Sequence, residues 1–240
     1  MAWFILVVII GAIIVFAGLG YLSRWDGLVQ DRVFYAHKKS SGPLKTAVFG
    51  TSLSARAKWP DELATALQDC GLGDTEVRRF AQAGANSSWG VAHLERLGHY
   101  NPDLVIVEFA MNDADVVDGL WPENSRNNLD EIVTRLRQKA PDVAIMLLST
   151  NPVTGWARLK RPFLGRYYAD YVAVAAQQDI GLLDGYGRWM QLPGRADDIP
   201  DGVHPVPEVE ARLLTQPIAE AIAVGFGADC RTGNGRSSKD

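Results

Sequence analysis

The stretch "TAVFGTSLSARA" (residues 46–57) sets the pattern that the rest of the chain repeats. A short apolar run with strand-favouring residues ends at Gly50, and a segment suited to a helix follows at once. A strand that leads directly into a helix is the first half of a βαβ unit. Ser52 stands at the junction, where a hydroxyl serves either as a nucleophile or as a helix cap. This stretch alone leaves both interpretations open.

Four more strand-like runs follow along the chain, separated by helical patterns. The runs cover residues 76–81, 104–110, 143–150 and 180–184, and the clearest helical patterns cover residues 59–73, 127–141 and 207–227. Strands that alternate with helices predict βαβ crossovers and a parallel sheet. We therefore predict an α/β fold with a five-stranded, mostly parallel sheet and helices on both faces.

Composition limits the classes of protein to which the chain belongs. It has 240 residues, of which 47% are hydrophobic and 22% charged, as expected for one domain with a sizeable core. The formal net charge of −4 argues against a nucleic-acid partner, which needs a clustered basic surface. The sequence has no zinc-protease, phosphate-loop or dinucleotide-binding motif, so we expect no metal and no cofactor.

The two cysteines, Cys70 and Cys230, lack the spacing of a zinc or redox motif. They are able to pair with each other, but the preferred interpretation is one half-buried thiol and one thiol in the tail.

Residues 2–22 carry no charged side chain, and a helix of this length spans the hydrocarbon core of a bilayer. We predict a transmembrane anchor over residues 1–22. Cleavage after "VFA" (15–17) is the alternative, but no basic residue precedes the segment as it does in signal peptides. The remaining predicted parts are a polar stalk over 23–44, the globular domain over 45–225 and a disordered tail over 226–240.

Residues that can take part in catalysis follow the ends of the predicted strands. Ser52 follows the first strand, Gly84 the second and Asn112 the third, while Asp201 and His204 precede the last helix. Ligands bind beyond the carboxyl ends of parallel strands, so these clusters should meet at one edge of the sheet.

Acyl transfer is the chemistry that these residue types can perform together. His204 is a suitable general base for Ser52, and Asp201 can orient the imidazole. The backbone N–H groups of Ser52 and Gly84 and the side-chain amide of Asn112 are candidate donors for an oxyanion hole.

These residues, in this order and spacing over about 46–225, resemble the SGNH (GDSL-type) hydrolase family. The resemblance implies a flavodoxin-like three-layer sandwich and a serine esterase with Ser52, Asp201 and His204 as its triad. Thr51 and Ala110 depart from the family pattern, since the family has an acidic residue and a glycine there. An inert binding module is therefore kept as an alternative.

The substrate is expected to be an O-acyl, chiefly O-acetyl, carbohydrate. The segment 151–171 offers aromatic and cationic side chains for a substrate rim, among them Trp156, Arg158 and Tyr167, although a solvated loop before an amphipathic helix explains the same pattern. A lysophospholipase, a thioesterase and an acyltransferase are the alternative activities.

Two arguments give opposite predictions for the side of the membrane on which the domain lies. Arg24, Arg32, Lys38 and Lys39 follow the apolar segment, and the positive-inside rule then places the domain in the cytoplasm. Resemblance to anchored family members of polysaccharide pathways favours the periplasmic or extracellular side, which is our expectation.

Overall fold

A single sheet forms the centre of the protein, for which the computed structural model describes residues 28–36 and 42–230. Its five strands lie in the order β2-β1-β3-β4-β5, and every neighbouring pair is parallel. The strands are β1 (Leu44–Gly50), β2 (Thr75–Ala81), β3 (Leu104–Glu108), β4 (Ala144–Ser149) and β5 (Gly181–Asp184). The predicted sheet is confirmed, with small shifts at the strand ends.

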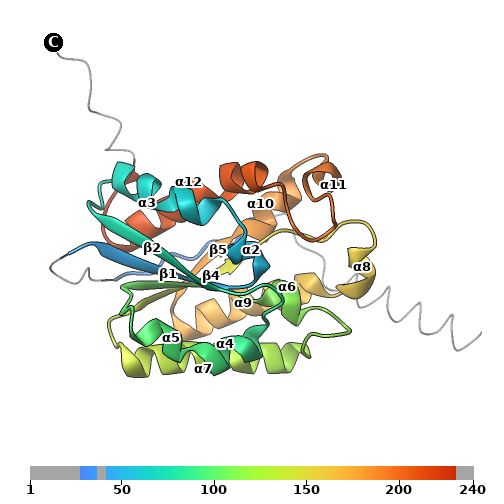
Figure 1. Cartoon of the computed structure of the whole chain (residues 1–240), viewed down its shortest axis with the longest axis horizontal. Coiled ribbons are helices and arrows are strands. Elements are labelled where there is room, and N and C mark those ends of the chain that lie inside the picture. The colour runs from blue at the N-terminus through green and yellow to red at the C-terminus, as the bar shows by residue number, and fades with distance from the viewer. Residues whose placement is uncertain (1–27, 37–41, 231–240) are drawn as a thin grey trace, which may run out of the picture.

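Helices cover both faces of the sheet and make a three-layer sandwich (Figure 1). The helices α3 (Trp59–Asp69) and α12 (Pro207–Gly225) pack together on one face. The helices α4 (Ser87–His93), α7 (Pro122–Lys139) and α9 (Leu164–Gln178) cover the other face. The short helices are α2 (Ser52–Ala55), α5 (Glu95–Gly98), α6 (Ala110–Asp113), α8 (Ala157–Lys160), α10 (Gly185–Gln191) and α11 (Arg195–Asp198).

Two hydrophobic clusters hold the layers together, one on each side of the sheet. Because successive side chains of a strand point to opposite faces, β1 sends Phe49 into one cluster and Val48 into the other. The strands β1, β3, β4 and β5 are buried along their whole length, apart from Lys45. Burial on both faces is what requires their nearly continuous apolar sequences.

Residues 28–36, predicted as part of a polar stalk, pack against the outer edge of the sheet instead. Arg32 forms an antiparallel bridge with Leu182 of β5, and Phe34 is 6% exposed within the α12 side of the core. The stalk prediction is wrong for these residues, because a docked strand-like segment covers the free edge of β5.

The domain also extends beyond residue 225, where the sequence predicted a disordered tail. The ring of Phe226 packs edge-on against Phe34, with ring centroids 5.8 Å apart. Cys230 forms a disulfide with Cys70, which ends α3. The preferred interpretation of two free thiols is therefore wrong, and the domain continues to Cys230.

Removing this disulfide is expected to destabilise the domain by about 2–4 kcal/mol, because the bond closes a long loop of the unfolded chain. It joins residues 160 apart in the sequence and fixes the end of α12 beside α3. Thermal unfolding of the Cys70→Ser/Cys230→Ser variant measures the effect. A reducing agent should lower the Tm of the native chain towards that of the variant and leave the variant unchanged; equal Tm values throughout would contradict the expectation.

The search for membrane-crossing helices covers only the part of the chain described here. Within residues 28–36 and 42–230, no helix is both long and apolar enough to span a bilayer. The predicted anchor over 1–22 lies outside the described residues, as do the predicted end of the tail over 231–240 and part of the predicted stalk.

Candidate active site

Ser52 is the first residue of α2, directly after the carboxyl end of β1. The cap of this helix is Thr51, whose hydroxyl accepts a hydrogen bond from the N–H of Leu53 at 3.1 Å. Capping, the structural explanation considered for Ser52, therefore belongs to its neighbour. The Ser52 hydroxyl is therefore available for other hydrogen bonds.

The side chains of Ser52, His204 and Asp201 form one continuous hydrogen-bonded chain. Ser52 Oγ lies 2.8 Å from His204 Nε2, and His204 Nδ1 lies 2.7 Å from Asp201 Oδ2. A carboxylate partner at Nδ1 holds the proton on that nitrogen, which leaves Nε2 as the acceptor for the serine hydroxyl. This is the arrangement that activates a serine for nucleophilic attack.

The loop that carries Asp201 and His204 is fixed by backbone contacts. Gly202 has a φ of +85°, and a Cβ there would lie 2.7 Å from the carbonyl oxygen of Thr154. The same glycine accepts a hydrogen bond from the N–H of Thr154 at 2.9 Å. Asn151 Nδ2 donates to the carbonyl of Val203 at 2.7 Å. The segment after β4 therefore positions the histidine loop.

The charge on Asp201 is maintained by its own loop. Burial alone would raise the pKa of Asp201, but hydrogen bonds from the backbone and ring of His204 and from the N–H of Val203 outweigh it and lower the pKa to about 2. The carboxylate consequently stays ionised at any pH near neutrality, and it can stabilise the imidazolium that forms when His204 takes a proton.

Gly84 lies on the turn after β2 and Asn112 lies on the short helix α6, and a hydrogen bond joins these two segments. Gly84 has a φ of +78° in the turn closed by the bond from Ala85 N to Gln82 O, so this position favours glycine. Asn112 Nδ2 donates to Ala85 O at 2.7 Å, and Gln82 N donates to Gly50 O at 3.0 Å. The turn after β2 is thereby tied both to the end of β1 and to α6.

Thr51, which departs from the family pattern, is buried and bonded to Glu108 at the end of β3. Its N–H donates to Glu108 Oε2 at 3.0 Å, and its hydroxyl lies within 3.0 Å of both carboxyl oxygens. Ser54 Oγ donates to the same carboxyl group at 3.0 Å. Glu108 therefore holds both sides of Ser52 in place, and sequence analysis missed it. The available signal was a lone charged residue in an apolar strand.

Ala110, the second departure, is buried in the hydrophobic core with 1% exposure. Its N–H and that of Phe109 both donate to the hydroxyl of Tyr171, at 3.1 and 2.7 Å. These contacts fix the start of α6, the helix that carries Asn112.

A second buried carboxyl group, Glu210 of α12, lies on the same side as Glu108. Burial raises the pKa of Glu210 to about 8, and the charge of Glu108 adds to the shift. Burial likewise raises the pKa of Glu108 to about 7 against the hydrogen bonds from Thr51 and Ser54. Burial therefore shifts both groups towards the protonated state in the folded protein.

Glu210→Gln is expected to make the domain less sensitive to alkaline pH. The unfolded chain releases the Glu210 proton near pH 4.5, whereas the folded chain keeps it up to about 8. Stability from this proton is complete below pH 4.5 and lost as pH rises towards 8, by on the order of a few kcal/mol. Thermal unfolding from pH 5 to 9 should show a shallower fall in Tm for Glu210→Gln than for the native chain. The exposed Glu208→Gln is the control, and parallel curves for all three proteins would contradict the assignment.

Of the residues predicted to form the substrate rim, the structure exposes two and buries one. Trp156 is 86% exposed, and Arg158 is exposed with its Nε bonded to Val153 O at 3.2 Å. Tyr167 is 6% exposed, and its hydroxyl donates to Leu120 O. Tyr167 is on the inner face of α9 and does not belong to a surface rim, so that prediction is corrected.

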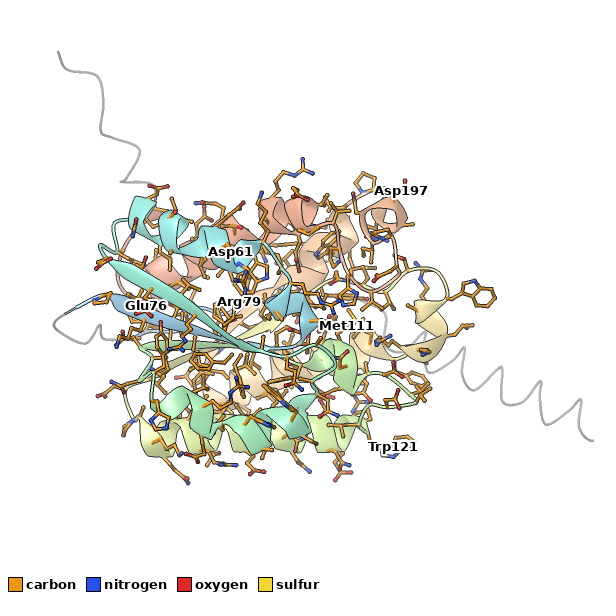
Figure 2. The ribbon with its side chains drawn as sticks, in the orientation of Figure 1. Asp61, Glu76, Arg79, Met111, Trp121 and Asp197 are labelled. Carbon is orange, nitrogen blue, oxygen red and sulfur yellow. A yellow bond between two sulfur atoms is a disulfide. The ribbon has the colours of Figure 1, made fainter. Side chains whose placement is uncertain are left out.

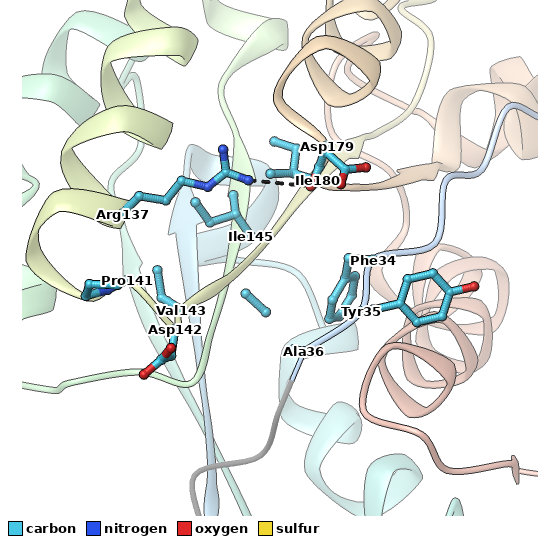
Figure 3. Close-up of a pocket in the computed structure, with 11 residues that line it drawn as sticks. Phe34, Tyr35, Ala36, Arg137, Pro141, Asp142, Val143, Ile145, Asp179 and Ile180 are labelled. Carbon is cyan, nitrogen blue, oxygen red and sulfur yellow. Dashed lines mark hydrogen bonds between the residues drawn. The ribbon is translucent and has the colours of Figure 1, made fainter.

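A cavity of about 320 Å³ lies at the opposite edge of the sheet from Ser52. Its lining includes Phe34, Arg137 and Ile145 (Figure 3). Since β4 begins at Ala144, this cavity is at the amino ends of the strands and takes no part in the Ser52 site. Within the described segments, no group of three or more His, Cys, Asp or Glu side chains is arranged to hold a metal ion.

Comparison with known proteins agrees with this geometry. Residues 46–212 match the GDSL-like lipase/acylhydrolase family. An arylesterase from Vibrio mimicus is 27% identical over 180 residues, which cover 69% of this chain and 82% of that protein.

Two solved structures share the fold. A lipase/acylhydrolase from Enterococcus faecalis superposes with a TM-score of 0.66 at 21% identity, covering 74% of this chain and 94% of that one. A carbohydrate acetylesterase from Sinorhizobium meliloti gives a TM-score of 0.61 at 18% identity, covering 75% and 98%.

The fold and the family match identify the class. The chain belongs to the GDSL-like lipase/acylhydrolase family. It is a serine ester hydrolase, and the alternative of an inert binding module is set aside.

Proposed function

We propose that this protein is a membrane-anchored esterase that removes O-acyl groups, chiefly O-acetyl, from a carbohydrate. The observation that carries the catalytic part is the hydrogen-bonded chain from Ser52 Oγ through His204 to Asp201. The structural likeness to a carbohydrate acetylesterase supports the substrate class.

In the first half of the proposed reaction, Ser52 Oγ attacks the ester carbonyl carbon while His204 Nε2 takes the hydroxyl proton. The carbonyl π electrons move onto the oxygen, and the N–H groups of Ser52 and Gly84 and the amide of Asn112 stabilise that oxyanion. The tetrahedral intermediate collapses, the bond to the sugar oxygen breaks, and His204 returns the proton to the leaving hydroxyl. An acyl-Ser52 remains.

The second half repeats these steps with water as the nucleophile. His204 takes a proton from water, hydroxide adds to the acyl carbon, and collapse releases the acid and restores the Ser52 hydroxyl. Asp201 orients the imidazole and stabilises its charged form throughout, which its low pKa allows.

Asn112→Ala is expected to lower kcat by about a hundred- to a thousandfold, which is typical for the loss of one oxyanion donor. Hydrolysis of an activated acetyl ester measures the effect, with the unfolding curve as a check that the domain is intact. Asn124→Ala, on the exposed face of α7, is the matched control. A near-native kcat for Asn112→Ala would show that Asn112 is not a donor of the oxyanion hole.

Substrate class is tested by comparing kcat/KM on an acetylated oligosaccharide, a lysophospholipid and a long-chain acyl thioester. The proposal expects the acetylated sugar to be the best of the three, with no turnover by Ser52→Ala. Preference for the lysophospholipid or the thioester would replace the carbohydrate proposal by the corresponding lipase or thioesterase. Analysis of products with a sugar acceptor present distinguishes hydrolysis from acyl transfer.

Anchoring and compartment are proposed on separate grounds. The uncharged segment over residues 2–22 supports an anchor. The Cys70–Cys230 disulfide supports a periplasmic or extracellular domain, since such bonds persist in oxidising compartments. A reporter fused after Asp240 tests the side: activity of a reporter that functions only outside the cytoplasm is expected, and activity of a cytoplasm-only reporter would reverse the assignment.

A further inference from the structure

The described chain begins at the same edge of the sheet as the active site. Gln30 N donates to Asp184 Oδ2 at 3.0 Å, and Asp31 Oδ1 accepts from Asp184 N at 2.9 Å. Asp184 is the last residue of β5 and precedes α10. Residues 28–31 therefore lie at the carboxyl ends of the strands, where β1 also delivers Ser52.

From this edge, the chain runs away from the active site. The Arg32–Leu182 bridge is antiparallel, and Ala36 N donates to Gly225 O at the end of α12. The described domain therefore begins, at residue 28, on the active-site side. In the sequence only residues 23–27 lie between the uncharged segment 2–22 and residue 28, and even a fully extended link of this length spans only about 20 Å.

Exposed hydrophobic side chains gather at the same edge on two neighbouring segments. The group, here called the apolar rim, consists of Val116, Val117, Trp121, Trp156 and Leu159, which are 57%, 69%, 80%, 86% and 67% exposed. In Figure 2, Trp121 projects outward from the domain. Leu28, the first described residue, is also 67% exposed. Such a concentration of exposed apolar surface marks an interaction site.

The two segments of the apolar rim are fixed to each other. Val116 N donates to Lys160 O at 2.8 Å, and Arg161 pairs with Asp115 at 3.0 Å while both side chains are 10% exposed. Arg161 Nε also donates to Met111 O at 2.8 Å, next to Asn112. The apolar rim is thus a supported surface joined to the active-site helix α6.

We infer that the apolar rim rests on a lipid bilayer, so that the active-site edge of the domain faces the membrane. This inference relies on the membrane anchoring proposed above. Tryptophan and aliphatic side chains suit the boundary between headgroups and acyl chains. Arg158 and Lys160 are exposed beside Trp156 and can bind lipid phosphates. The charge of Asp115 is paired with Arg161, and the exposed Asp118 offsets one of the two positive charges. Esters carried at the membrane surface then lie beside Ser52.

A depth measurement on the full chain tests this orientation. Leu159→Cys and Val117→Cys each provide one free thiol for an environment-sensitive fluorophore, since both native cysteines are bonded. Val224→Cys is the control, because Val224 is 45% exposed at the far end of α12. The labelled chains are reconstituted in vesicles of phosphatidylcholine and phosphatidylglycerol with brominated acyl chains, which quench nearby fluorophores.

Bromine is expected to cause a loss of fluorescence at positions 117 and 159 and none at position 224. An equal loss of fluorescence at all three positions, or quenching at 224 alone, would overturn the orientation. Flotation of the vesicles checks anchoring. If the chain does not float with the vesicles, the anchor is refuted and with it the inference. Hydrolysis of a soluble aryl ester, measured on the same samples, reports separately on whether the chain is an esterase.

Discussion

Ser52→Ala is expected to lower kcat for ester hydrolysis by about 10⁶-fold, as loss of the serine does in other triad hydrolases. The methyl group cannot form the acyl intermediate, and no other hydroxyl is hydrogen-bonded to His204 among the described residues. Initial rates with an activated acetyl ester measure the loss.

Two controls distinguish lost chemistry from lost structure. Ser88→Ala removes an exposed hydroxyl that accepts a hydrogen bond from Asn128 on α7, so its kcat should stay close to native. The Tm of Ser52→Ala should also remain native-like, because Thr51 caps α2 and Glu108 holds the turn. A kcat within tenfold of the native value would mean that Ser52 is not the nucleophile.

Asp201→Asn is expected to lower kcat by about 10⁴-fold with little change in KM, because an amide that donates to Nδ1 stabilises the wrong imidazole tautomer. His204 Nε2 would then carry the proton and could not accept one from Ser52. The asparagine oxygen can still accept the backbone N–H bonds of Val203 and His204, at 2.8 and 2.6 Å in the native loop. The loop should therefore keep its shape.

The matched control for Asp201→Asn is Asp197→Asn, which removes an exposed carboxylate from the nearby α11 (Figure 2). It should leave kcat and KM unchanged. If Asp201→Asn lost less than tenfold in kcat, Asp201 would not be the partner that orients His204.

Much of the fold was predictable because local patterns agree with the global structure. The strands before Gly50 and after Pro102 read as apolar runs since both faces of these strands are buried. The site residues were predictable for a related reason: parallel strands deliver Ser52, Gly84 and Asn112 to the same edge. Proximity then follows from topology.

Other features depend on packing between distant segments, which no local pattern encodes. Residues 28–36 mix apolar and charged side chains without a clear strand pattern. They dock because the edge of β5 provides backbone partners for Arg32. Cys70 and Cys230 meet only because α3 and α12 pack side by side. The cationic sequence neighbours of Tyr167 predict a position on a surface rim, whereas its position on α9 turns the ring into the core.

Glu108 explains why Thr51 is compatible with the site despite departing from the family pattern. A buried carboxyl group needs hydrogen-bond donors, and Thr51 supplies both a backbone N–H and a hydroxyl. The partnership joins residues that are 57 apart in the sequence. It forms because β1 and β3 are neighbouring strands of the sheet.

The central claim, that Ser52 is the nucleophile of this ester hydrolase, is tested most directly with a fluorophosphonate probe. The folded chain is treated with the probe, digested and analysed by mass spectrometry. We predict one adduct, on the peptide that contains Ser52, with labelling strongly slowed in His204→Ala. Absence of an adduct on the folded protein, or an adduct on another serine with Ser52 unmodified, would contradict the claim.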